Sequence, residues 1–352
     1  MASALALAMS SLPSKAAEPL AAPATPPSVT LLETPPEHVR TPDQTFLTFP
    51  EWYLVHSPAE YADYLAHGGE PSGFPFFSHI GQFWQGYAAV TREISQYPFN
   101  YGYHLMVIVI GTSTTVEYAI KGSYEATIGH VFELLTTGQE QVPEELFAAR
   151  YAQAYVNFIR IDPWYKSDFL AQLRTLWTDY PMDSHNMARR LERRFALSVE
   201  LIVKEGYAWL SRLGTQSLYD EPKPVTVVQL TRRPSSDAAF PDINVIKEDT
   251  SIGAVLVAIP RYEAFTRYSR FLASQGEDFA SIAGNAGEVV VSFLVDEGKP
   301  TPAGRLLFTQ PIITRPGHTR MVMAVPIAHL ANTLRATDTP DSGTSIEHIY
   351  DF

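Results

Sequence analysis

The feature of this sequence that most limits its fold is a phrase that occurs twice. Residues 254–260 read AVLVAIP and residues 320–326 read RMVMAVP, so the two prolines are 66 residues apart. Each copy is an apolar run that ends at a proline, which is typical of a strand followed by the first turn of a helix. The spacing therefore predicts an internal repeat.

The repeat extends beyond this phrase in both copies. A helix is predicted after each proline, and the same offset relates the next apolar segments, 279–284 and 345–350. Two more strands, 288–295 and 305–314, are predicted on either side of the turn DEGKPTPAG. Duplicated strand–helix–strand units with antiparallel strands between them predict a ferredoxin-like α+β sandwich for residues 225–352.

The preceding part of the chain has helical periodicity. Ser57-Pro58-Ala59-Glu60 reads as a capping box with proline in the first turn, and predicts a short helix at 58–67. Apolar residues at spacings of three and four predict a long amphipathic helix from Asp183 or Ser184 to Gly214. Further helices are predicted at 78–94, 144–160 and 163–177.

These patterns predict an α+β protein. Its predominantly α-helical, aromatic-rich N-terminal domain covers residues 43–215, and a linker at 216–224 leads to the ferredoxin-like domain. The first 42 residues are rich in alanine, proline and threonine and offer little apolar surface for a core. We expect residues 1–42 to be a disordered tether or a remnant export signal, since an Ala/Leu stretch lies near the start without a basic residue before it.

Charge and cysteine content exclude several classes of function. The chain carries 26 Lys and Arg against 38 Asp and Glu, a net charge of −12, whereas nucleic-acid binding needs a basic face. It has no cysteine, which excludes disulfides and Cys-ligated zinc. The ten histidines lack metal-ligand spacing, and no HExxH, P-loop, GxSxG, GxGxxG or EF-hand motif is present. No metal and no nucleic acid is expected, and no cofactor can be named.

The stretch from residue 101 to 135 is open to two interpretations. Its continuous apolar run, 105–110, is far shorter than the roughly 18 residues of a membrane span. A buried strand or helix is one interpretation, and a monotopic or re-entrant membrane segment is the other. His104 and Glu117 lie about 140° apart on a continuous helix, so they do not share a face. Lys121 follows Glu117 by four residues and indicates an ion-pair ladder that continues to Glu125.

Polar side chains within aromatic segments are the candidates for chemistry. Glu51 stands beside Trp52 and Tyr53, and His79 lies in the segment that carries Trp84. Desolvation raises the pKa of a carboxylate and lowers that of a histidine, as in acid–base pairs. We consider Glu51 and His79 as proton-transfer groups, with Trp52, Tyr53, Trp84 and His104 around an apolar ligand. The alternative is that they are polar groups at the rim of an aromatic core with satisfied hydrogen bonds.

The segment RRLERR, residues 189–194, places like charges four residues apart. Arg189 and Arg193 form one such pair and Arg190 and Arg194 the other, so acidic partners are expected to offset the repulsion. Carboxylates of neighbouring helices are one source of these partners. An anionic lipid headgroup or phosphate bound by Arg190 and Arg194 is the other.

The phrases TFLTFPEWYLV, GQFW and GTSTTVEYAIKGSYEATIG resemble a group of uncharacterised bacterial proteins, some of which begin with a membrane segment. The resemblance covers mainly residues 45–210. It implies no reaction and no functional residues, and it favours the cell envelope. We expect this chain to differ from that group in lacking a full N-terminal membrane helix.

Our leading hypothesis is a membrane-associated or cell-envelope protein whose helical domain binds a lipid or another apolar small molecule. A cytoplasmic location is the alternative. The competing hypothesis is an enzyme that uses Glu51 and His79 in an apolar pocket. A third is a structural protein that forms homo-oligomers through a sheet edge.

Overall fold

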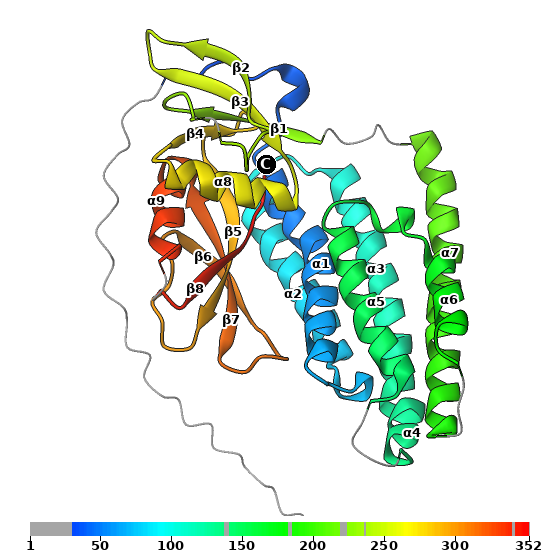
Figure 1. The fold of residues 1–352 in the computed structure, drawn as a ribbon. Coiled ribbons are helices and arrows are strands. Elements are labelled where there is room, and N and C mark those ends of the chain that lie inside the picture. Colours follow the sequence, from blue (N-terminus) through cyan, green and yellow to red (C-terminus); the bar gives the residue numbers. More distant parts are fainter. Residues whose placement is uncertain are drawn as a thin grey trace, which may run out of the picture.

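The protein has a helical part at residues 44–218 and a β part from residue 225 onward (Figure 1). The structure is a computed structural model that describes residues 30–136, 141–181, 185–218, 224–235, 237–339 and 342–351. The helices lie alongside one another on one side of the molecule, and the strands with two more helices form the other side (Figure 1). The predicted α+β class is confirmed.

Long helices that run alongside one another build the helical part. Their bounds are α1 Gln44–Ala66, α2 Phe76–Glu93, α3 Tyr101–Tyr124, α4 His130–Leu134, α5 Pro143–Ile159, α6 Phe169–Thr178 and α7 Met187–Leu218. The π-helical turn η4, Glu125–Gly129, joins α3 to α4, so that one rod of helix runs from Tyr101 to Leu134. The stretch for which the sequence allowed a buried strand, a buried helix or a membrane segment is therefore helical.

Two helix boundaries differ from the prediction. The helix predicted from 163 starts at Phe169, because Asp168 supplies the N-cap and accepts a hydrogen bond from the Ala171 N–H at 2.8 Å. The long helix predicted to end at Gly214 continues to Leu218. Its predicted cap, Asp183 or Ser184, lies outside the described residues, and so does most of the predicted linker, residues 219–223.

The short helix predicted to begin at Pro58 is wrong. Instead, α1 starts at Gln44 and contains Pro50 and Pro58 in its interior. Each interior proline costs about 3 kcal/mol, but burial of one large side chain stabilises by roughly 1.5–3 kcal/mol, and α1 buries many. Its buried aromatic residues are Phe46, Phe49, Trp52 and Tyr53. Tertiary burial therefore outweighs the local start signal at Ser57.

The β part consists of two units with the same order of elements. The first is β1 Val225–Leu230, β2 Asn244–Asp249, β3 Ala254–Pro260, α8 Glu263–Ser274 and β4 Phe279–Ile282. The second is β5 Glu288–Asp296, β6 Arg305–Pro311, β7 His318–Pro326, α9 Ile327–Thr337 and β8 Thr344–Ile349. Each unit forms its own antiparallel sheet, with strand orders β2-β3-β1-β4 and β6-β7-β5-β8.

This topology differs from the predicted ferredoxin-like sandwich. A ferredoxin-like fold places two strand–helix–strand units in one sheet, whereas here each unit has one helix and a four-stranded sheet of its own. The inner faces of both sheets share one apolar core with α8 and α9, including Val257, Phe265, Val291 and Leu330. The two units of the repeat therefore pack against each other through this shared core.

The helical part covers the outer face of the second sheet. Rings of α1 and α2, such as Phe49 and Phe83, pack with Val290, Val322 and Tyr350 in a common apolar cluster. Residues 30–42 cover the first sheet instead of forming a free tether. The buried Gln229 side chain accepts a hydrogen bond from the Leu32 N–H at 2.8 Å and donates one to the Thr30 carbonyl at 2.9 Å. Residues 1–29 lie outside the described part.

Candidate functional site

His79 lies at the centre of a buried polar cluster between α1, α2 and α3. Its Nδ1 is 2.9 Å from the Ser57 hydroxyl and 3.2 Å from the Tyr53 hydroxyl, and Ser57 also contacts the Tyr118 hydroxyl at 3.0 Å. Tyr53 donates its proton to Gln82 at 2.8 Å. The other ring nitrogen of His79, Nε2, faces Glu60 Oε2 at 3.7 Å.

This arrangement has the elements of an activated serine, but it has no room for a substrate. A serine hydroxyl held by an imidazole that faces a carboxylate is the pattern of nucleophilic catalysis. The cavity beside Ser57 and His79 measures only about 10 Å³, roughly the space of one water molecule. Burial, helped by the charge of Arg320, lowers the pKa of His79 to about 4 and keeps the imidazole neutral. The cluster is a buried polar core in which His79 Nε2 and Glu60 Oε2 have no hydrogen-bond partner among the described residues.

Glu51 does not belong to the His79 cluster. It precedes Tyr53 by two residues on α1, which places the two side chains about 200° apart around the helix. The Glu51 carboxylate accepts a hydrogen bond from Tyr103 of α3 at 2.8 Å. Burial raises the pKa of Glu51, and the Tyr103 hydrogen bond opposes that rise. The structure thus separates the two groups that the enzyme hypothesis needs as a pair.

A second polar cluster joins α1 to the second sheet, and sequence reasoning missed it. Arg320 of β7 is buried and binds Glu60 of α1 at 2.9 Å and Glu347 of β8 at 2.6 Å. His56 Nδ1 lies 3.6 Å from Glu347, and burial lowers the pKa of His56 to about 4. Burial would raise the pKa of Glu347, but Arg320 holds it at about 2. These contacts fix the β part against α1.

The remaining aromatic and histidine candidates lie in three different places. Trp52 stacks on His348 with ring centroids 3.6 Å apart, at the contact with the β part. Trp84 donates its indole N–H to Thr115 at 2.9 Å. His104 stacks on Phe99 at 4.2 Å and its Nδ1 is 2.8 Å from the Tyr87 hydroxyl. The predicted ligand-binding residues therefore do not line one pocket.

The arginines of the RRLERR segment of α7, residues 189–194, are buried in a cluster of carboxylates. Arg190 donates two hydrogen bonds to Glu144 of α5, at 2.9 and 3.1 Å, and Arg194 donates one to the same carboxylate at 2.8 Å. Each arginine is at most 4 % exposed and Glu144 is fully buried. The structure therefore contradicts the interpretation in which Arg190 and Arg194 bind a lipid headgroup, because neighbouring helices supply the acidic partners.

The other two arginines of this segment have partners of the same kind. Arg189 binds Glu145 at 2.7 Å. Arg193 binds Glu125 through two hydrogen bonds, at 3.0 and 2.9 Å, and Glu125 lies in the π-helical turn. All four arginines of the RRLERR segment are thus neutralised inside the helical part.

A second layer of charge lies between α3 and α7. Glu200 of α7 accepts hydrogen bonds from Lys121 of α3 and Lys204 of α7, both at 2.9 Å, and Lys204 also lies 3.3 Å from Glu117. Burial alone would lower the pKa of the two lysines, but the carboxylates raise both. The predicted ladder along α3 is wrong in detail, since Lys121 pairs with α7 and not with Glu117.

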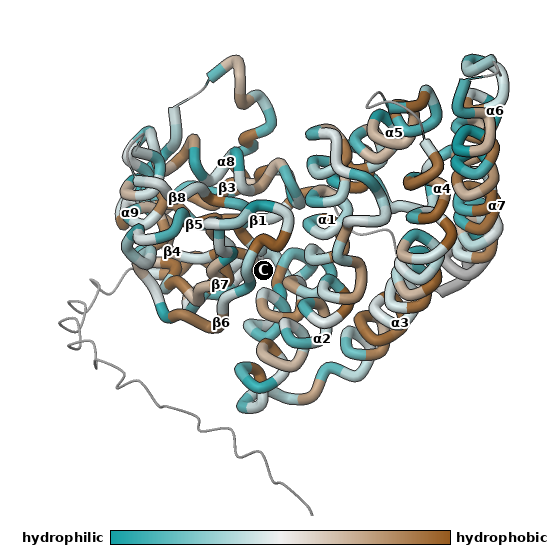
Figure 2. Tube along the Cα trace, turned by 90° about the horizontal axis from the view of Figure 1, so that it is seen from below, coloured by the Kyte–Doolittle hydropathy of each residue, from teal (hydrophilic) through white to brown (hydrophobic). Residues whose placement is uncertain are grey.

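The outward sides of α3 and α7 are apolar. Between Leu191 and Leu210, all nine exposed residues of α7 are aliphatic, aromatic or glycine, and every charged residue there is buried or half-buried. On α3 the exposed side carries a single charge, Glu117. Figure 2 shows hydrophobic positions along both helices. We call this surface the apolar face; its large members are Tyr101, Leu105, Ile108, Val109, Val116, Ile120, Leu191, Phe195, Val199, Ile202, Val203, Tyr207, Trp209 and Leu210.

Both stripes of the apolar face point to the same side of the molecule. The helices are antiparallel, since Ser113 contacts Tyr207 while Lys121 contacts Glu200. At about 100° per residue, the exposed stripe of each helix lies about a third of a turn from the residues that contact the other helix. In both helices the stripe is rotated from the contact residues in the same direction when each chain is followed from its N-terminus. Because the two helices are antiparallel, this rotation brings both stripes onto the same side of the helix pair.

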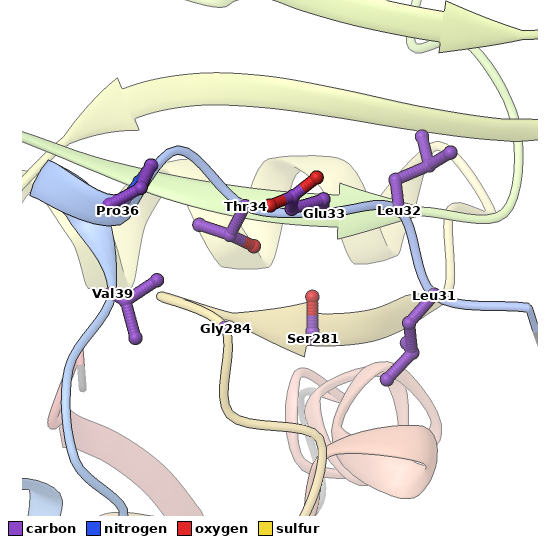
Figure 3. Close-up of a pocket in the computed structure, with 8 residues that line it drawn as sticks. All are labelled: Leu31, Leu32, Glu33, Thr34, Pro36, Val39, Ser281 and Gly284. Carbon is purple, nitrogen blue, oxygen red and sulfur yellow. The ribbon is translucent and has the colours of Figure 1, made fainter.

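A larger cavity lies elsewhere, at the first sheet. It measures about 490 Å³ and lies between residues 31–39 and the end of β4, with Leu31, Thr34, Val39 and Gly284 among its walls (Figure 3). Leu31 and Val39 are about half exposed, so the cavity is open to solvent. None of the residues predicted from the sequence lines it.

Among the described residues, no three His, Asp or Glu side chains are grouped so as to hold a metal ion. None of the helices that the structure describes has the length and apolar character to cross a membrane. Comparison of the chain with family models, with curated proteins and with solved structures finds no match. The resemblance to the TFLTFPEWY group stays a prediction.

Proposed function

We propose that this is a membrane-associated protein whose helical part binds lipid through the apolar face of α3 and α7. One observation carries the proposal: these two helices expose large apolar residues, and all of their charged residues except Glu117 are buried or half-buried. Leu105, Ile120 and Phe195 are each more than 60 % exposed, whereas Arg193, Arg194 and Glu125 are at most 5 % exposed in their side chains. In water a helix arranges these residue types in the opposite way.

The size of the apolar face supports stable binding. Complete burial of a large aliphatic or aromatic side chain stabilises by about 1.5–3 kcal/mol. The apolar face carries many such side chains, so contact with hydrocarbon outweighs the roughly 4–15 kcal/mol that association costs. Salt bridges contribute little, because the charged residues near the face are already paired with one another.

The composition of the face favours lipid over a protein partner. Protein–protein interfaces have a polar rim and form about one hydrogen bond per 100–200 Å². The exposed side of α7 from Leu191 to Leu210 offers only the hydroxyl of Tyr207 and the indole N–H of Trp209, and the hydroxyl is already bonded to Ser113. A surface with so few hydrogen-bonding groups suits an acyl-chain environment, in which such groups have no partners.

Flotation with phosphatidylcholine vesicles tests this proposal. We expect the wild-type protein to float with the vesicles and the double variant Phe195→Glu/Ile202→Glu to lose at least tenfold in the bound fraction. The matched control is Val245→Glu/Leu306→Glu, which adds the same charge at exposed apolar positions of the β part. The control is expected to float like the wild type. A wild-type protein that stays in the soluble fraction would overturn the proposal, and so would equal binding by both variants.

A further inference from the structure

We infer that the helical part lies on a single leaflet, with α3 and α7 parallel to the membrane plane. This inference rests on the proposed function, and it adds the orientation and depth of the contact. It follows from two observations: how far the exposed apolar residues extend along the helix axis, and which side of each helix they occupy.

The apolar stripe of the α3–α4 rod runs along its whole length but on one side only. Exposed apolar residues continue from Tyr101 through Val116 and Val131 to Leu134. The 34 residues from Tyr101 to Leu134 extend over about 50 Å at 1.5 Å per residue, while the hydrocarbon core of a bilayer is about 30 Å thick. An upright rod would therefore leave much of its apolar stripe outside the hydrocarbon.

The opposite side of the rod packs on the rest of the protein. His104, Gly111 and Tyr118 are buried on that side, where Gly111 fits against the ring of Phe83 of α2. A helix that is apolar toward one side and packed on a globular body with the other lies in an interface, with its apolar side a few ångströms deep.

The neighbouring helices also exclude an upright orientation. Helix α5 runs alongside α7 (Figure 1) and exposes Arg150, Gln153 and Asn157. If α3 and α7 stood upright in the bilayer, α5 would stand at the same depth and hold these side chains in hydrocarbon. An arginine at the bilayer centre costs at least roughly 2.5–3.5 kcal/mol. With the helices parallel to the membrane, α5 stays on the aqueous side.

Single-cysteine labelling measures this orientation directly. The chain has no cysteine, so each introduced cysteine is the only labelled position. We choose Leu105→Cys, Val116→Cys, Ile120→Cys and Val131→Cys along the rod, each carrying an environment-sensitive fluorophore. Its depth in phosphatidylcholine vesicles is measured by quenching with lipids spin-labelled at two depths. The control is Val245→Cys on β2, which is expected to show no quenching.

The inference predicts equal depths, within about 3 Å, at all four positions of the rod. An upright rod predicts depths at residues 105 and 120 that differ by about 22 Å, since fifteen residues rise 1.5 Å each. A difference in depth of this size would overturn the proposed orientation but would leave the proposed function standing. No quenching at any of the four positions would overturn both.

Discussion

Helix α7 and the outer surface of the β part differ in where they keep their charged residues. In the β part, apolar residues such as Phe293 and Leu330 fill the common core, and ion pairs such as Arg270–Asp338 lie at the surface. In the helical part, Arg190, Glu144 and their neighbours are buried while large apolar residues are exposed. The β part is thus built for water on its outside, and the helical part is built for an apolar environment on one side.

The largest expected effect of this difference is on stability. Glu144→Gln should lower the free energy of unfolding by about 3–5 kcal/mol, because it leaves Arg190 and Arg194 buried without the negative charge of the carboxylate that they share. The β-part counterpart is Asp338→Asn, which breaks the exposed pair with Arg270 and should cost at most about 1 kcal/mol. Urea unfolding of both variants measures this. Equal costs would remove the distinction between the two parts.

The next effect is a pH dependence that arises inside the helical part, at His79. The pKa of His79 is about 4 in the folded protein against about 6.5 in the unfolded chain, so the unfolded state binds more protons between these values. The stability that His79 contributes is present above about pH 6.5 and is lost as the pH falls toward 4.

The expected loss from His79 is about 3 kcal/mol between pH 7 and pH 4. Unfolding free energies of the wild type and of His79→Gln, measured across this range, isolate it, because His56 and Glu60 titrate in both proteins. The variant should show a shallower decline. Parallel curves for the two proteins would mean that His79 is not held neutral.

The smallest effect compares one residue from each part. Ile327→Val removes a single methylene from the core of the β part and should cost about 1 kcal/mol. Phe195→Ser removes a whole ring from the apolar face and should change the stability in water by at most about 0.5 kcal/mol, because Phe195 is 61 % exposed. Thermal or urea unfolding of both variants measures the two losses of stability. A larger cost at Phe195 would show that its ring is packed on the protein in solution.

Local patterns in the sequence predicted much of the fold. The strands and helices after Ala254 and His318 follow the 66-residue repeat, because a buried strand that ends at a proline is a local signal. The pairing of strands into two sheets depends on contacts between distant residues, such as Val228 with Val257, and local patterns do not report it. In α1, the signal at Ser57 is overridden by burial of Phe49 and Trp52.

The candidate site was predicted less well, for reasons of helix phase and long-range pairing. Glu51 and His79 were expected together, but a continuous α1 turns Glu51 toward Tyr103. The acidic partners of the α7 arginines were expected, but that Glu144 is the partner of Arg190 requires the packing of α5 on α7. The amphipathic pattern of α7 was clear, yet it does not tell which side faces outward. Here the charged side faces inward.

The central claim is that the protein reaches lipid by apolar contact and not by charge. The most direct test is the partition coefficient onto phosphatidylcholine vesicles at low and at high salt, for the wild type and for Phe195→Glu/Ile202→Glu. The account predicts wild-type partitioning that changes less than twofold with salt and at least a tenfold loss in the variant. Partitioning that needs anionic lipid and disappears in high salt would contradict it, as would no partitioning at all.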